Sequence, residues 1–135
     1  MKPTVRSKVF VADDSPLVRE RLISLLTELP NVEVVGQTGA AVEAIDSIRK
    51  LKPTAVVLDI SMPGGGMSVL ETIKKEDQAP MVIMLTNFSN EPYRRRCFQL
   101  GADYFFDKSN EFDKVIQVLR GRRPRSAVQR PVVNR

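Results

Sequence analysis

Hydrophobic residues in this chain follow two alternating patterns, and the alternation predicts the fold. Four short apolar runs have the length and composition of strands buried in a parallel sheet: residues 8–12, 55–58, 81–85 and 104–106. Val32, Val34 and Val35 predict a further strand over residues 32–35, part of which alternates apolar and polar residues. Between and after them, apolar residues recur with helical spacing within residues 16–29, 39–51, 67–73, 92–100 and 112–119. Strands that alternate with helices predict one parallel α/β sheet with helices on both faces.

Short polar residues indicate where three of these helices begin. Their side chains can accept a hydrogen bond from a free N–H group of a first helical turn. Ser15 is expected to cap the first helix, Thr38 or Gly39 to open the second, and Ser109 or Asn110 to cap the last.

The composition predicts one soluble globular domain. The chain has 135 residues, 42% of them hydrophobic and 27% charged. No apolar run approaches the roughly 18 residues of a membrane helix, and we find no signal-peptide core. A single cysteine, Cys97, allows no internal disulfide, so we expect a cytoplasmic protein in which this thiol packs in the core. Without histidine, zinc sites and Cys–His catalysis are excluded.

The formal charge of +5 is concentrated at the C-terminal end. Six arginines and no acidic residue lie from Arg120 onward, whereas residues 1–119 hold 15 basic and 16 acidic residues. We therefore expect a domain over residues 1–121 that itself binds neither nucleic acid nor a membrane. Residues 122–135 form a basic tail that is a linker to a further domain, a disordered end, or an arm for nucleic acid or acidic surfaces.

Polar residues follow or end four of the five predicted strands. Asp13 and Asp14 follow the first strand, Asp59 the third and Lys108 the fifth, while Thr86 ends the fourth. Because the carboxyl ends of parallel strands share one edge, we expect these side chains to converge. Three carboxylates together require a cation, and hard oxygen ligands favour Mg²⁺. A lysine and a hydroxyl beside them suit the holding or transfer of a phosphoryl group.

Four segments carry a resemblance to a known family. They are Val-Phe-Val-Ala-Asp-Asp-Ser (9–15), Val-Leu-Asp-Ile-Ser-Met-Pro-Gly (57–64), Met-Leu-Thr (84–86) and Gly-Ala-Asp-Tyr-Phe-Phe-Asp-Lys (101–108). In this order, each at a strand end, they resemble the CheY-like receiver domain of two-component response regulators, from about Lys8 to Leu119. The resemblance implies a flavodoxin-like, doubly wound α/β fold of five parallel strands in the order 2-1-3-4-5 with five helices. It also implies a phosphoacceptor signalling domain rather than a turnover enzyme.

The resemblance assigns a role to each side chain at the shared edge. Asp59 matches the phosphoacceptor, which takes a phosphoryl group from a sensor histidine kinase or a phosphotransfer protein. Asp13, Asp14, Asp59 and the backbone carbonyl of Ser61 match the Mg²⁺ ligands. Lys108 matches the lysine that pairs with the phosphoryl oxygens.

A switch is implied as well. Thr86 matches the hydroxyl that moves toward the phosphoryl group, and Tyr104 matches the aromatic residue whose rotamer follows it. This movement is expected to reshape the surface of the helix 92–100, the strand 104–106 and the final helix, and so to signal to a downstream protein target. The resemblance also allows a homodimer that forms on phosphorylation. It identifies neither the kinase nor the target.

Three residues depart from the usual pattern of the family. Ser109 stands where proline commonly follows the lysine, so we expect a trans peptide after Lys108, since a cis bond before a non-proline residue costs about 3 kcal/mol. Asn87 replaces a small residue beside the switch position. Phe88, like Ser61, occupies a position that affects dephosphorylation, and we expect its bulk to hinder the attacking water and prolong the phosphorylated state.

Other functions are open to such a chain. They are a phosphorylation-independent protein-binding module, the N-terminal part of a longer DNA-binding response regulator, and a small-molecule enzyme or flavin binder. The retained carboxylates, hydroxyl and lysine argue against the first, and the short loops against the last. No helix-turn-helix pattern follows Gly121. The Gly64–Gly66 run is not followed by the Gly-Lys-Ser/Thr of a phosphate-binding loop. The three arginines Arg94–Arg96 form either a solvated face or a docking surface.

Overall fold

The computed structural model describes residues 7–121; the predicted tail over residues 122–135 lies outside the described residues, as do residues 1–6. All ten predicted elements are present and alternate along the chain. They are β1 (Ser7–Ala12), α1 (Pro16–Thr27), β2 (Val32–Thr38), α2 (Ala41–Leu51), β3 (Ala55–Leu58), α3 (Gly66–Lys74), β4 (Met81–Thr86), α4 (Glu91–Gln99), β5 (Tyr104–Asp107) and α5 (Phe112–Leu119).

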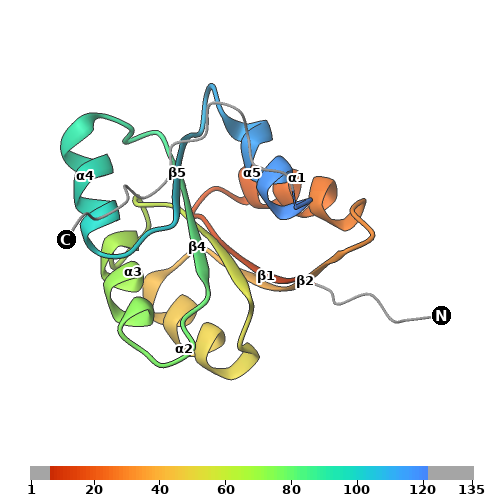
Figure 1. Cartoon of the computed structure of the whole chain (residues 1–135), viewed down its shortest axis with the longest axis horizontal. Helices are drawn as coiled ribbons and strands as arrows, with labels where there is room; N and C mark the ends of the chain where they lie inside the picture. Colours follow the sequence, from red (N-terminus) through yellow and green to blue (C-terminus); the bar gives the residue numbers. More distant parts are fainter. Residues whose placement is uncertain (1–6, 122–135) are drawn as a thin grey trace.

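The strands form one parallel sheet in the order β2-β1-β3-β4-β5 (Figure 1). Buried residues of α1 and α5 pack against one face of the sheet, and those of α2, α3 and α4 pack against the other. This arrangement confirms the flavodoxin-like, doubly wound fold. None of the helices between residues 7 and 121 combines the length and apolarity that a membrane crossing requires.

Burial on both faces explains why the inner strands β1, β3 and β4 contain continuous apolar runs. Val9 and Val11 of β1 contact the α1/α5 layer, whereas Phe10 and Ala12 contact the layer of α2, α3 and α4. All four residues of β3 are at most 2% exposed. Because full burial of an aliphatic side chain stabilises a protein by about 1.5–3 kcal/mol, both sides of these inner strands favour apolar residues.

The first helix begins at a side-chain cap, and the second begins without one. Ser15 caps α1 as predicted, because its hydroxyl accepts a hydrogen bond from a backbone N–H of the first turn at 3.3 Å. The prediction that Thr38 or Gly39 opens α2 is wrong, since the helix begins after Ala40. Thr38 is instead the last residue of β2, and its hydroxyl donates to the Glu43 carboxylate at 2.7 Å.

The predicted cap of α5 at Ser109 or Asn110 is also wrong, because the helix begins after Glu111. Asn110 donates to the Asp107 carboxylate at 2.6 Å, and the Ser109 hydroxyl donates to the Asn87 side-chain oxygen at 3.3 Å. Both side chains therefore stabilise the turn between β5 and α5 instead of capping the helix.

A close approach explains the last glycine of the run after β3. A Cβ at Gly66 would overlap the backbone carbonyl of Asp59, and the N–H of Gly66 donates to the carbonyl of Ile60 at 2.9 Å. Any side chain at this position would push α3 away from the end of β3. The glycine therefore fixes the backbone around Asp59.

Candidate functional site

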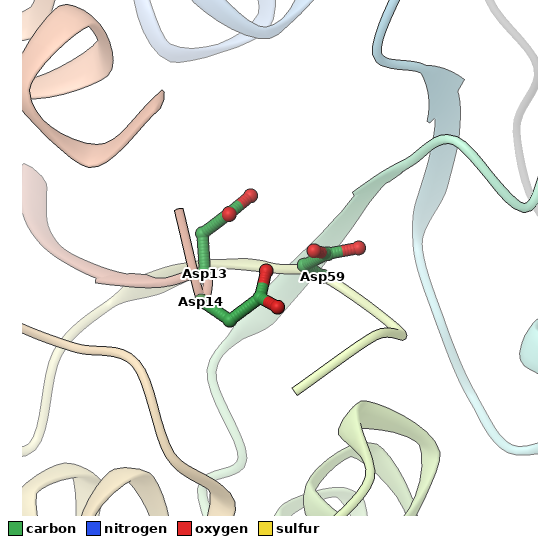
Figure 2. A group of neighbouring side chains, drawn as sticks. All are labelled: Asp13, Asp14 and Asp59. Atoms are coloured by element: carbon green, nitrogen blue, oxygen red, sulfur yellow. The ribbon is translucent and has the colours of Figure 1, made fainter. Parts of the chain in front are cut away.

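Three carboxylates meet at the carboxyl edge of the sheet, as predicted (Figure 2). One oxygen from each of Asp13, Asp14 and Asp59 lies within 4.8 Å of the other two. Backbone hydrogen bonds extend the sheet to these residues: the N–H of Asp13 donates to Thr38 and that of Asp59 donates to Ala12, both at 3.0 Å. Two neighbouring strand ends thus deliver the three side chains to one place.

Lys108 reaches the two buried carboxylates from the turn after β5. Its Nζ lies 2.8 Å from Oδ2 of Asp13 and 3.1 Å from Oδ2 of Asp59, and the three side chains are 12%, 3% and 2% exposed. Its own N–H donates to the carbonyl of Thr86 at 3.0 Å, which ties the turn to β4. The Lys108–Ser109 peptide is trans, as expected.

The pKa values of Asp13 and Lys108 are both raised, the first because of burial and the second in spite of it. Burial raises the pKa of the Asp13 carboxyl above 3.8, and the hydrogen bonds from Lys108 and Ser15 offset only part of this effect. Burial alone would lower the pKa of Lys108, but the hydrogen bond to Asp13 and the charges of Asp59 and Asp13 raise it above 10.5. Lys108 therefore stays protonated at neutral pH.

The donor set fits Mg²⁺. One ammonium balances only part of the charge of three carboxylates, and Asp14 is exposed to solvent. The set contains hard oxygen ligands and neither a histidine nor a thiol, which matches the preference of Mg²⁺. Ser61 lies beside the carboxylates, since its N–H donates to Oδ1 of Asp59 at 3.3 Å.

A cavity of about 370 Å³ opens at Asp14 and Asp59. Its lining consists of Asp14, Ser15, Val18, Asp59, Ser61, Asn87, Phe88 and Lys108. Two of the residues that depart from the family pattern, Asn87 and Phe88, therefore line the same cavity as Asp59. The Phe88 side chain is 44% exposed, and its ring lies 5.4 Å from that of Tyr93.

Thr86 and Tyr104 lie on opposite faces of the sheet. Thr86 is fully buried, its hydroxyl accepts a hydrogen bond from the N–H of Phe88 at 3.1 Å, and it is paired in register with Asp107. Alternation along β5 places Phe105 on the face of Thr86, and places Tyr104 on the other, where it stacks on Phe106. The structure therefore does not bring Tyr104 to the predicted switch hydroxyl.

Phe105, which was not predicted as a site residue, lies on the same face of the sheet as that hydroxyl and is paired in register with Met84. It is 2% exposed, and its ring lies 6.3 Å from the ring of Phe98 on α4. Phe105 can be identified from the alternation of side chains along a strand. It lies two residues before Asp107, the register partner of Thr86, and therefore on the same face as Thr86.

Helix α4 has a buried face and a basic face. Cys97 is fully buried, and burial raises the pKa of its thiol to about 12, which agrees with a packing role. Arg94 pairs with Glu91 at 3.1 Å, while Arg95 and Arg96 are exposed.

Comparisons with known proteins agree with this geometry. The profile of the response regulator receiver domain matches residues 9–120. The transcriptional regulatory protein BtsR of Salmonella typhi is 35% identical over 125 residues, which are 90% of this chain and 51% of BtsR. Protein-glutamate methylesterase/protein-glutamine glutaminase 1 of Methanospirillum hungatei is 34% identical over 114 residues, 82% of this chain and 33% of that protein. The chain thus spans between a third and about half of these relatives.

Solved structures support the same assignment. A chain of the CheX-CheY-BeF3-Mg complex from Borrelia burgdorferi superposes with a TM-score of 0.78 and 25% identity, covering 87% of this chain and 89% of that chain. The acidic cluster, the strand order and the profile match point to one conclusion. The chain belongs to the family of response regulator receiver domains, which are phosphoacceptor signalling domains rather than classical enzymes.

Proposed function

We propose that this receiver domain accepts a phosphoryl group on Asp59 from a sensor histidine kinase or a phosphotransfer protein. Asp13, Asp14, Asp59 and the backbone carbonyl of Ser61 would hold the Mg²⁺ that the reaction requires. The observation that carries the proposal is the pairing of Asp59 with Lys108, 49 residues away, beside two further carboxylates and at a cavity that both residues line. An aspartate that only capped a helix would need neither partner.

Each group at the site has its own task in this reaction. An oxygen of Asp59 attacks the donor phosphorus; the new P–O bond forms as the bond from phosphorus to the donor nitrogen breaks, and that nitrogen keeps the electron pair. The N–H of Ser61 and the ammonium of Lys108 each hold one carboxylate oxygen and so orient the nucleophile. Lys108 then pairs with the phosphoryl oxygens. Mg²⁺ supplies positive charge that reduces the repulsion between the anionic nucleophile and the phosphoryl group.

The signal would leave the site through Thr86. New phosphoryl oxygens offer its hydroxyl an acceptor, and movement toward them breaks the hydrogen bond from Phe88 and leaves space on the face of the sheet that Phe105 shares. Phe105 adjoins Phe98 of α4, so its repacking shifts α4 relative to β5. The altered α4-β5-α5 surface then contacts a downstream protein. This route uses Phe105, and the orientation of Tyr104 toward the other face leaves it outside the route.

The domain boundary belongs to the same proposal. The family match ends at residue 120 and α5 ends at Leu119, which supports a receiver domain over residues 1–121 followed by a basic tail over residues 122–135. Receiver domains are typically cytoplasmic, and we place the phosphoryl transfer in that compartment.

Treatment with acetyl phosphate and Mg²⁺, followed by intact-mass spectrometry, tests the proposal. The wild-type chain should gain one phosphoryl group only when Mg²⁺ is present, and Asp59→Asn should gain none. Asp46→Asn, which removes an exposed carboxylate from α2, is the matched control and should be modified like the wild type. Modification of Asp59→Asn, or a wild type that stays unmodified with acetyl phosphate and with kinases, would favour a phosphorylation-independent binding module.

A further inference from the structure

Asp13 is held at all four of its polar groups. Its carboxylate oxygens accept hydrogen bonds from the N–H of Ser15 at 2.9 Å and from Lys108 at 2.8 Å, and its own N–H donates to Thr38. The fourth group, the backbone carbonyl, accepts a hydrogen bond from Nη1 of Arg19 at 2.6 Å. A side chain on α1 therefore holds the peptide that joins Asp13 to Asp14.

The same guanidinium also reaches the end of β2. Nε of Arg19 donates to the side-chain oxygen of Gln37 at 2.9 Å. Gly39 leaves room for the group, because a Cβ at this position would lie 2.8 Å from Nη1. The planar fork thus connects α1, the end of β1 and the end of β2 through two donors in a fixed geometry, which a lysine cannot reproduce.

We propose that Arg19 is a positioning residue for the Mg²⁺ site. By holding the carbonyl of Asp13 it fixes the orientation of the peptide before Asp14, and so the direction in which the exposed Asp14 carboxylate leaves the backbone. The inference rests on the proposed role of Asp13 and Asp14 as Mg²⁺ ligands. Groups that orient metal ligands in this way commonly contribute about 10–100-fold to metal affinity.

The direction in which removal of Arg19 changes the Mg²⁺ affinity distinguishes a positioning role from a purely electrostatic one. Arg19 is a cation close to a site for a cation, so charge alone predicts that its removal strengthens Mg²⁺ binding. Positioning predicts the opposite, because a mobile Asp13–Asp14 peptide costs conformational entropy when the ligands are ordered. We expect Arg19→Ala to weaken Mg²⁺ binding about tenfold.

Mg²⁺ titrations by calorimetry and by amide chemical shifts test the inference; the chain has no tryptophan to report by fluorescence. Arg19→Ala and Arg19→Lys should both bind Mg²⁺ more weakly than the wild type, since the lysine keeps the charge but loses the fork. Arg21→Ala is the matched control on the same helix. The Arg21 guanidinium lies over the Phe112 ring at 4.2 Å, so this variant should lose stability but keep its Mg²⁺ affinity.

Each result decides between the possibilities. A folded Arg19→Ala that binds Mg²⁺ as tightly as the wild type, or more tightly, overturns the inference. A wild type that binds no Mg²⁺ contradicts the proposed function instead. If Arg19→Ala does not fold, Arg19→Lys decides instead: it keeps the charge but loses the two-donor fork, and unaltered Mg²⁺ binding in it overturns the inference.

Discussion

Replacing Lys108 by methionine removes the only ammonium that contacts Asp13 and Asp59 among residues 7–121 while keeping much of the side-chain volume. Two hydrogen bonds of 2.8 and 3.1 Å disappear, and two carboxylates that are at most 3% exposed lose their counter-charge. Breaking a buried ion pair by removing one partner typically costs about 3–5 kcal/mol. That is a large part of the roughly 5–15 kcal/mol by which native domains are stable, so we expect a marginally stable Lys108→Met variant.

The loss of stability in Lys108→Met should depend on pH in a defined direction. In the wild type the raised pKa of Lys108 means that its stabilisation is fully present below 10.5 and is lost only as the pH rises through the raised value. Without Lys108, a group that lowers the pKa of Asp13 is gone, so this pKa rises further. The folded variant then binds a proton that the unfolded chain does not, and its stability increases as the pH falls from neutrality toward 3.8.

Urea unfolding followed by circular dichroism measures these differences, with and without Mg²⁺. Mg²⁺ should stabilise Lys108→Met more than the wild type, because the unbalanced carboxylates bind the cation more tightly. Lys75→Met is the control: the Lys75–Glu71 pair on α3 is 73% and 45% exposed, so its loss should cost less than about 1 kcal/mol.

Two results would contradict the argument. A loss in Lys108→Met no greater than that in Lys75→Met would mean that the buried pairs contribute little net stability. A loss of several kcal/mol that stays constant between neutral and acidic pH would mean that it comes from packing of the lysine chain, and not from the unpaired carboxylates.

Two further predictions concern the lifetime of the phosphorylated state and the path of the switch. Phe88→Ala should shorten the half-life of the aspartyl phosphate, measured by loss of phosphate after removal of the donor, because Phe88 lines the cavity that the attacking water must enter; an unchanged half-life would contradict this. Phe105→Leu should reduce the change in amide shifts of α4 on addition of BeF3⁻ and Mg²⁺, whereas Tyr104→Leu should leave it nearly unaltered, since only Phe105 shares a face with Thr86. The reverse ranking would assign the switch to Tyr104.

Much of the fold was predictable because the pattern along each strand is simple. A strand covered by helices on both faces has no polar side, so the run 55–58 is apolar at every position and each residue is at most 2% exposed. The helix starts were less predictable. Thr38 and Asn110 have the chemistry of caps, yet their hydrogen bonds go to Glu43 and Asp107, partners that a local rule does not rank against the helix N-terminus.

By itself the sequence determined the class of fold, the four charged residues that meet at the carboxyl edge and the family. It could do so because strand direction sends every strand end to the same edge, and position along the chain then identifies the side chains there. Only the tertiary structure decided that Lys108 contacts Asp13 as well as Asp59, that Arg19 holds the backbone of Asp13, and that Phe105 lies on the face of Thr86. These facts depend on distances between segments far apart in sequence and on the phase of alternation along β5. Local composition carries no information about either.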